Sequence, residues 1–391
     1  MKCDAALFLC KECAKDGNLK LYINASNPTE NKCCICKKNG KSISIENNQE
    51  TANIFKSLIR FYFSEDVYNP HWGGKELYRI FESENPILEN RFTIENDDGD
   101  DELELSDVIS ALTSEPKASG KLGVSIYDNV NGYYGHNLQN SRSEVYRSFL
   151  GDSLKVNHYL IEDKVINYLK NFVDKITTEI PINTRLSRCR IGTKDAKLKV
   201  RKMIGKRIVF PYQREDVSAP PPHLATNGRL NRPGVSFLYL ASDENTAISE
   251  VKPHPGHEVS VANFDSKRNL KFANFKDADF KKFWLTDEEL NRYLFLRDVN
   301  QHFSIPIPPT NTSLGYIGTQ MISNSIRQLG FDGIIYKSSV TPGTNYVCFN
   351  SFDFNYADKS SKVCKISSLK YEYIDCEYEL EQEVGGDVSY F

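Results

Sequence analysis

Apolar residues in the first half of the chain recur at spacings of three and four, which is the pattern of amphipathic helices. In the clearest run, which begins near residue 49, one face is formed by Ile54, Leu58, Ile59, Tyr62 and Phe63. Shorter repeats of this kind occupy 75–81 and 106–112, and a longer one occupies 160–180, where Pro181 ends it. This half of the chain is therefore predicted to be mainly helical.

Beyond this proline the apolar residues form short runs bounded by turn residues, which is the pattern of β-strands. Strands are predicted over 183–191, 235–240, 259–264, 270–272, 331–339 and 345–349. Helices are predicted among them over 245–250, 287–296 and 316–329. A helical region followed by mixed strands and helices favours the α+β class.

This change in pattern divides the 391-residue chain into four segments. We predict a cysteine module at 1–45, a mainly helical domain at 46–180, a strand-rich domain at 181–375 and a tail at 376–391. The helical domain contains an acidic run at 96–104, which we interpret as a solvated loop because no partner ligands accompany it.

The composition restricts the classes of function. Hydrophobic residues make up 40% of the chain, which is enough for real cores, and the net charge of −3 gives no general attraction to nucleic acid or anionic membranes. No apolar run approaches the ~20 residues that a membrane-spanning helix needs. The apolar stretch at the N-terminus is too short for the core of a signal peptide. We therefore expect a cytoplasmic protein with no membrane partner.

Six of the ten cysteines lie within the first 36 positions, and four of them form two C-x-x-C pairs. The pairs are Cys10 with Cys13 and Cys33 with Cys36, and 19 residues separate them. Two such knuckles close a tetrahedron of thiolates, and this spacing is typical of structural zinc sites. Four protein ligands leave no open position, so we expect no catalysis at this site. Free thiols are the alternative, and Cys34 is a possible substitute for a neighbouring ligand.

The rest of the cysteine module says less about function. Residues 19–24 are predicted to form a short strand between the two pairs. Lys32, Lys37 and Lys38 form only a thin basic patch, which argues against nucleic acid as a partner. A segment this short buries too little apolar surface to fold alone, so the metal would supply its folding free energy.

The stretch 228–250 is the densest conjunction of site-like features. A turn carrying Arg229 and Asn231 precedes the strand at 235–240, and a helix that ends with Glu250 follows this strand. This order can bring the guanidinium and the carboxylate to one end of a sheet. The alternative is an ordinary surface ion pair between Arg229 and Glu250.

Arg188 and Arg190 alternate along the predicted strand 183–191, so they lie on the same face. Two guanidinium groups on one face suit a pyrophosphate. The alternative is a solvated edge strand with no ligand.

Several motifs together resemble the RES family, which is named for an arginine, a glutamate and a serine, and the resemblance extends from about residue 183 to 352. The motifs are Arg188-Cys189-Arg190, Gly228-Arg229-Leu230-Asn231, Leu238-Tyr239-Leu240-Ala241-Ser242 with Thr246-Ala247 and Glu250, Thr319-Gln320, and Asp332-Gly333-Ile334-Ile335-Tyr336-Lys337-Ser338. The two C-x-x-C pairs and the helix after them also resemble the cysteine-bearing domain found ahead of RES and HEPN toxin domains.

The resemblance implies an ADP-ribosyltransferase-like RES domain preceded by a helical region and a small four-cysteine zinc module. It implies NAD as the substrate and a toxin of a toxin–antitoxin pair, which degrades NAD by phosphorolysis or hydrolysis and is neutralised by a partner protein. Some members are described as ADP-ribosylating a protein instead.

Carried over to this sequence, the family motifs imply that Arg188, Arg229, Glu250 and Ser338 are catalytic. Four further residues are then expected to bind the substrate: Arg190, Asn231, Tyr239 and Tyr336. Ser339 is a neighbouring alternative to Ser338. One departure concerns Ser187, because the family commonly has tyrosine before the first arginine; if that ring stacks on the substrate, another aromatic residue must replace it.

The chemistry of NAD agrees with a site that has one carboxylate. Nicotinamide is cationic in NAD and leaves as a neutral molecule, so no general acid is needed, unlike the two-carboxylate arrangement of glycosidases. Glu250 would hold the ribose hydroxyls and stabilise the developing positive charge, the two arginines would clamp the pyrophosphate, and Ser338 would orient the ribose or a phosphate. No histidine accompanies these motifs, so a serine nucleophile is not expected.

Several alternatives stay open. The attacking group is phosphate or water, or a residue of a target protein if the enzyme is a protein ADP-ribosyltransferase. A different class is a nucleic-acid-binding protein with a zinc module and an inactive RES domain. The chain has no G-x-G-x-x-G motif, which disfavours a hydride-transferring Rossmann enzyme. The oligomeric state is open, a homo-oligomer included.

Overall fold

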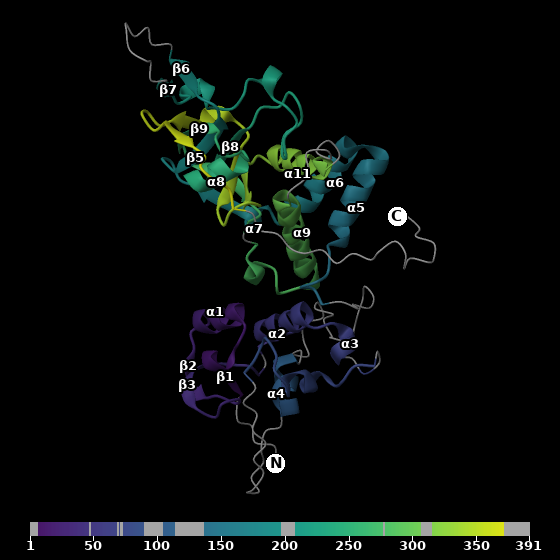
Figure 1. The fold of residues 1–391 in the computed structure, drawn as a ribbon. Helices are drawn as coiled ribbons and strands as arrows, with labels where there is room; N and C mark the ends of the chain where they lie inside the picture. Colours follow the sequence, from purple (N-terminus) through teal and green to yellow (C-terminus); the bar gives the residue numbers. More distant parts are fainter. Residues whose placement is uncertain are drawn as a thin grey trace, which may run out of the picture.

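The computed structural model of the chain describes residues 7–46, 48–68, 70, 73–89, 105–113, 137–196, 208–276, 278–305 and 315–370. Its N-terminal elements gather at one end and a large sheet with its helices at the other (Figure 1). The predicted acidic loop at 96–104 and the predicted tail at 376–391 lie outside the described residues.

The cysteine module is a small sheet with one helix. Its strands are β1 (Phe8–Cys10), β2 (Thr29–Lys32) and β3 (Asn39–Ser44), in the antiparallel order β1-β3-β2, and η1 (Lys11–Cys13) follows β1. The prediction of a strand over 19–24 is wrong, because α1 spans Gly17–Ala25. Asp16 caps this helix by accepting a hydrogen bond from the Leu19 amide at 2.8 Å. Leu19 and Ile23, four residues apart, are buried together, and that spacing suits a helix.

The helices that follow confirm the amphipathic pattern. They are α2 (Gln49–Tyr62), α3 (Glu65–Tyr68), η3 (Leu77–Phe81) and α4 (Leu105–Thr113). Asn48 caps α2 by accepting a hydrogen bond from the Thr51 amide at 3.1 Å. The apolar faces of α2 and α4 join the cysteine module in one core. The first part of the chain is therefore one packed unit and not a zinc knuckle on a tether.

The second part is organised around a nine-stranded mixed sheet in which β10 and β11 are the parallel pair. Its principal order is β13-β9-β5-β8-β12-β11-β10-β4, and β14 also pairs with β9. The strands are β4 (Thr177–Ile180), β5 (Arg185–Ile191), β8 (Leu238–Ala241), β9 (Glu258–Ser266), β10 (Leu270–Asn274), β11 (Gly333–Lys337), β12 (Thr344–Cys348), β13 (Phe354–Tyr356) and β14 (Lys362–Lys365). A separate hairpin joins β6 (Lys194–Ala196) and β7 (Ile208–Phe210).

The helices of the second part pack on this sheet, most of them around an aromatic-rich core, whereas α8 packs on β5 and β8 in a smaller core. They are α5 (Glu144–Asp152), η4 (Ser153–Asn157), α6 (His158–Lys170), α7 (Val173–Ile176), α8 (Glu244–Glu250), α9 (Asp287–Ser304) and α11 (Ile317–Gln328). Short 3-10 turns are η5 (Arg214–Asp216), η6 (Pro222–Leu224), η7 (Phe280–Lys282) and η9 (Ser351–Asp353). No helix among the described residues has the length and apolar character needed to cross a lipid bilayer.

The helix predicted over 160–180 is wrong at its end. The chain turns into β4 at Thr177, and β4 pairs antiparallel with β10. Threonine is β-branched and fits an extended strand better than a helix, so its pairing with β10 decides the conformation. The predicted domain boundary at 180 and 181 therefore falls within the large sheet, between β4 and β5, and α6 and α7 pack on its core.

Candidate functional site

Glu250 lies at the C-terminal end of α8, where the sheet brings β11 and β12 together. Its Oε1 atom accepts two hydrogen bonds, from Ser338 Oγ at 2.7 Å and from Asn345 Nδ2 at 2.6 Å. The other carboxylate oxygen, Oε2, accepts none within the described part of the chain. The carboxylate is therefore held by one oxygen, and its second oxygen is available to a ligand.

Strand register explains why these donors meet. Asn345 on β12 is the pairing partner of Tyr336 on β11, and Ser338 comes directly after β11. Asp243 caps α8 by accepting a hydrogen bond from the Thr246 amide at 2.8 Å, and this orients the helix that ends with Glu250. Of the two candidate serines, Ser338 is the one that contacts Glu250.

Asn345 is the residue that sequence reasoning missed. It is 5% exposed, although asparagine is rarely buried without partners. In the sequence it is only the first residue of a predicted strand, and nothing nearby marks it as part of a site. A polar residue at the start of an apolar strand was the one available signal. Its significance depends on pairing with β11, which lies elsewhere in the sequence.

The loop that carries Arg229 is fastened on two sides. Tyr239 donates from its hydroxyl to Asn231 Oδ1 at 2.7 Å, and the same hydroxyl accepts from the Leu230 amide at 3.2 Å. Gln320 on α11 donates to the carbonyls of Gly228 and Asn231 at 2.7 and 2.9 Å. The predicted substrate-binding residues Asn231 and Tyr239 therefore act here by shaping the loop.

Gly228 is the residue that this fastening requires. A Cβ at this position would lie 2.2 Å from Asn231 Oδ1 and 3.0 Å from the Tyr239 hydroxyl, which is too close for any side chain without a shift. The neighbouring Thr319 also donates its hydroxyl to the Arg229 carbonyl. The Thr319-Gln320 pair therefore secures the backbone on both sides of the arginine.

The guanidinium of Arg229 is placed by the end of α9. Its Nη1 donates to the carbonyl of Ile305 at 2.8 Å and, at 3.4 Å, to that of His302. The ring of Tyr316 lies 5.7 Å from the guanidinium carbon, within cation–π range. Within the described residues, Arg229 and Glu250 form no ion pair with each other, so the alternative of a surface ion pair between them is not what the fold contains.

Arg188 and Arg190 both reach the segment around η5, as expected for two residues on one face of a strand. Arg188 donates from Nε to the Val217 carbonyl at 2.6 Å and from Nη1 to the Tyr239 carbonyl at 2.7 Å. Arg190 is exposed and donates to the Asp216 carbonyl. Burial lowers the pKa of Arg188 to about 10, and Arg190 adds to this effect, so Arg188 is still a cation at neutral pH.

Tyr239 and Tyr336 are neutral members of this region. Burial raises the pKa of both phenols above the usual value. Next in size for Tyr336 are the effects of Tyr239 and Glu250, which also raise its pKa, whereas Arg229 lowers it. These mutual effects place Tyr239, Tyr336, Glu250 and Arg229 in one electrostatic neighbourhood. Arg190 lies further out.

Ser187, the residue before Arg188, does not face the same side of the sheet as Arg188. Ser187 is buried and donates from Oγ to Asn263 Oδ1 on β9 at 3.0 Å. Successive side chains of a strand point to opposite faces, so Ser187 lies on the face opposite Arg188. The serine at this position therefore removes no ring from the Arg188 side in this chain.

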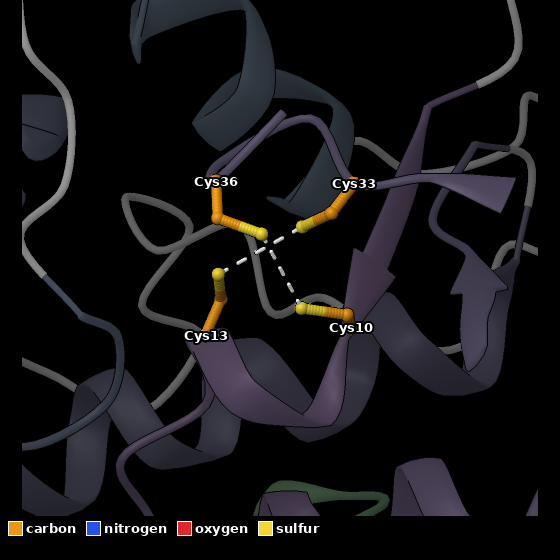
Figure 2. Close-up of side chains that lie close together, drawn as sticks. All are labelled: Cys10, Cys13, Cys33 and Cys36. Carbon is orange, nitrogen blue, oxygen red and sulfur yellow. Dashed lines mark hydrogen bonds between the residues drawn. The ribbon is translucent and has the colours of Figure 1, made fainter. Parts of the chain in front are cut away.

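The four predicted cysteines meet in the N-terminal module (Figure 2). Their sulfur atoms all lie within 4.8 Å of one another, and Cys10–Cys36 and Cys13–Cys33 are each separated by 3.8 Å. Tetrahedral Zn–S bonds of ~2.3 Å require sulfur separations of about 3.8 Å, so the set fits a metal ion. Cys34 is buried but is not a member of the set.

Comparison with known proteins concerns the site around Glu250. The family model of the RES domain matches residues 206–367, a segment that contains Arg229, Glu250, Ser338 and Asn345. The chain contains a RES domain. The match begins after β5, so Arg188 and Arg190 precede it, yet β5 is an inner strand of the RES-domain sheet between β9 and β8.

One solved structure matches about half of this chain. It is a chain of the crystal structure of the M. tuberculosis MbcT–MbcA toxin–antitoxin complex, with 10% sequence identity and a TM-score of 0.28. The alignment covers 51% of this chain and 92% of that chain. A search of the curated proteins gave no match.

Proposed function

We propose that the RES domain cleaves the bond between nicotinamide and ribose in NAD, and that the protein is a cytoplasmic toxin or defence effector. The observation that supports this most directly is the state of Glu250. Its Oε1 is held by Ser338 and Asn345, and Oε2 makes no hydrogen bond within the described residues. A carboxylate with one restrained and one available oxygen suits a substrate that develops positive charge.

In the proposed step the C–N bond to the ribose breaks and its electron pair goes to the pyridinium ring, which leaves as neutral nicotinamide. The ribose carbon becomes oxocarbenium-like, and Glu250 Oε2 stabilises this charge or holds a ribose hydroxyl. Phosphate or water then attacks the ribose carbon, which gives ADP-ribose-1″-phosphate or ADP-ribose. The residues support the bond cleavage equally well with either attacking group.

Arg188 and Arg229 would bind the pyrophosphate with the N–H groups that the protein does not use. Arg229 donates from Nη1 to the carbonyls of His302 and Ile305. The Nε and Nη2 edge of the same guanidinium could therefore form a bidentate contact with phosphate. Arg188 donates from Nε and Nη1 to backbone carbonyls, so its Nη2 is the group that could donate to a phosphate oxygen. Arg190 would contribute from the rim of the same segment.

The toxin role rests on the RES family, whose members act in toxin–antitoxin pairs and degrade NAD. An enzyme that consumes NAD without restraint harms its own cell, so we include a neutralising antitoxin among the expected partners. A second candidate function on this scaffold is transfer of ADP-ribose to a protein. Labelled NAD distinguishes the two, because transfer leaves the label on protein and cleavage leaves it on a small product.

We also propose that Cys10, Cys13, Cys33 and Cys36 hold zinc, with a structural role. All four ligand positions would be filled by thiolates, which leaves none for a substrate. The pKa of Cys10 is raised to about 11 by burial and by Cys33, so without a cation this thiol disfavours the charged form. A zinc ion would reverse this preference and hold all four as thiolates.

The first test is an NMR or mass assay of NAD incubated with the protein, with and without phosphate. We expect release of nicotinamide, and the ribose product identifies the attacking group. Glu250→Gln keeps the shape of the side chain but removes its charge, and should lower turnover by about a thousandfold. Glu244→Ala is the matched control, because Glu244 begins the same helix and pairs with Lys362 at the surface. If Glu250→Gln turned NAD over at the wild-type rate, this assignment would be wrong.

A further inference from the structure

Helix α9 is buried or half-buried along most of its length, which is unusual for a helix that carries so many polar residues. From Glu289 to Asn300 no side chain is exposed. Leu290 and Leu294 belong to the core of the cysteine module and α2, whereas Phe295 and Val299 belong to the core of the RES domain. One helix is therefore built into both cores, and it lies between them in Figure 1.

The segment that leads into α9 carries the contacts with the N-terminal part. Trp284 is 4% exposed, and its ring meets that of Tyr22 on α1 edge-to-face at 6.0 Å. Phe280 on η7 meets Phe61 on α2 at 4.9 Å between ring centroids. Ser57 on α2 also donates its hydroxyl to the Trp284 carbonyl. Ring contacts and a backbone hydrogen bond thus fix the start of α9 against α1 of the module and against α2.

The middle of α9 is joined to α2 through the segment 137–141. Arg297 donates from Nη1 to the carbonyls of Leu138 and Gln139, each at 2.9 Å. The Leu138 amide in turn donates to the Arg60 carbonyl near the end of α2 at 3.0 Å. These bonds connect the middle of α9 to the end of α2.

The far end of α9 touches both segments that carry candidate catalytic residues. The carbonyls of His302 and Ile305 hold the Arg229 guanidinium. Ser304 Oγ donates to the Lys337 carbonyl at 3.0 Å, directly before Ser338, which holds Glu250. The same helix that is anchored on the cysteine module thus sets the place of the arginine and of the strand end that restrains the glutamate.

We propose that the geometry of the RES active site depends on the cysteine module. In this proposal, α9 connects the metal-dependent fold of the module to the positions of Arg229 and Ser338. The consequence for catalysis rests on the proposed function, but the structural coupling does not. Although the module shares its core with α2 and α4, a metal held by the four thiolates would fix its two knuckles in place. Loss of the metal would loosen the core that Trp284, Leu290 and Leu294 share with the module, and the loop of Arg229 would then lose its fixed carbonyl partners.

The test is hydrogen–deuterium exchange on the full-length protein, before and after a chelator removes the metal. We expect amides at 300–305 and 228–231 to exchange about tenfold faster after removal, whereas the central strands β5 and β9 stay protected. Unchanged exchange at both segments after complete metal loss would overturn the proposal, as would equal loss of protection throughout the sheet. This measurement needs no NAD, so it stands even if the proposed reaction is wrong.

A variant that keeps the metal provides a second, independent test. Leu294→Ala removes an apolar group of α9 from the N-terminal core without changing a cysteine, and Leu112→Ala on α4 removes a similar buried group from the same core. We expect both to retain stoichiometric zinc, but only Leu294→Ala to speed exchange at 228–231. If NAD is the substrate, kcat should fall by about tenfold in Leu294→Ala and stay near wild type in Leu112→Ala. Equal behaviour of the two variants would refute the connection through α9.

Tryptophan fluorescence gives a third measurement. The chain has two tryptophans, so Trp72→Phe leaves Trp284 as the reporter at the contact with Tyr22. Removing the metal should shift Trp284 emission to longer wavelength because the ring becomes hydrated. Emission that did not move would mean that the contact survives without metal, which contradicts the proposal.

Discussion

The cysteine cluster and the cluster around Glu250 are built in opposite ways. The four cysteines lie in two C-x-x-C knuckles within one short segment of the chain, so local geometry brings their sulfur atoms together. Glu250 ends a helix, Ser338 follows β11, Asn345 lies in β12 and Arg229 lies in a loop, so only the tertiary structure assembles residues this far apart in the sequence. A metal would stabilise the first cluster, whereas part-buried hydrogen bonds stabilise the second. Loss of one cysteine should therefore disrupt the whole cysteine cluster, whereas loss of one hydrogen bond should weaken the cluster around Glu250 only in part.

The largest effect is expected at the metal. Cys13→Ser removes one of four ligands, and a structural zinc site contributes about 10 kcal/mol of binding free energy that is also folding free energy. We expect loss of bound zinc and of the cooperative unfolding transition of the module, measured by metal analysis and calorimetry. Cys34→Ala is the control, since this buried cysteine adjoins the ligands but is not one of them, and it should keep the metal. Zinc retained by Cys13→Ser would show that the cluster is not built as described.

Next in size is the effect of Asn345. Asn345→Leu keeps the volume but leaves Glu250 Oε1 with Ser338 as its one donor. Under the proposed function, kcat should fall by about ten- to a hundredfold, and the free energy of unfolding by about 1–3 kcal/mol because a half-buried carboxylate oxygen loses one of its two donors. Steady-state kinetics and thermal denaturation check the two parts. A variant with unchanged kcat would remove Asn345 from the site.

Gly228→Ala tests whether the Arg229 loop is as tightly fitted as its contacts indicate. The added methyl group would meet Asn231 Oδ1, so the pair formed by Asn231 and Tyr239 must shift, at a cost of about 1–3 kcal/mol. Gly151→Ala is the matched control, because a Cβ there meets nothing within 4 Å and the residue lies in α5. That change should raise stability slightly. Similar melting temperatures for the two variants would argue that the loop is loose.

The smallest effect is expected for Tyr239→Phe. The change removes a hydroxyl that donates to Asn231 and accepts from Leu230, while the ring stays in place. The expected loss is about 1 kcal/mol of unfolding free energy, with a higher KM for NAD and little change in kcat, because the tyrosine acts on the loop and not on the reacting bond. A large drop in kcat with constant KM would instead place its hydroxyl in the reaction.

The sequence predicted the cysteine cluster more completely than the cluster around Glu250. For the cysteines, spacing alone was sufficient to name all four members of the cluster. For the second site, the RES motifs named Glu250 and Ser338, which do touch, but the motifs could not say that Asn345 completes the group. They also did not indicate that Asn231 and Tyr239 serve the loop, or that carbonyls of α9 hold Arg229.

The secondary structure differs from prediction where two patterns coincide. Leu19, Leu21 and Ile23 alternate as in a strand, but Leu19 and Ile23 alone also satisfy the spacing of a helix. The structure buries that pair and leaves Leu21 53% exposed, so capping by Asp16 and the neighbouring core favour the helix. At 177–180 the helical periodicity continues into a segment that β10 captures as a strand.

The sequence by itself determined which segments bury an apolar face, where four thiols can surround a metal, and which family the strand-rich part resembles. These properties depend on spacing within a few residues or on motifs that can be read without contacts. Only the tertiary structure decided that β5 belongs beside β8, that Glu250 has one oxygen restrained, and that α9 joins the cysteine module to the RES domain. Pairing register and core membership depend on residues distant along the chain, and hydrophobic periodicity specifies which face is buried but not against what.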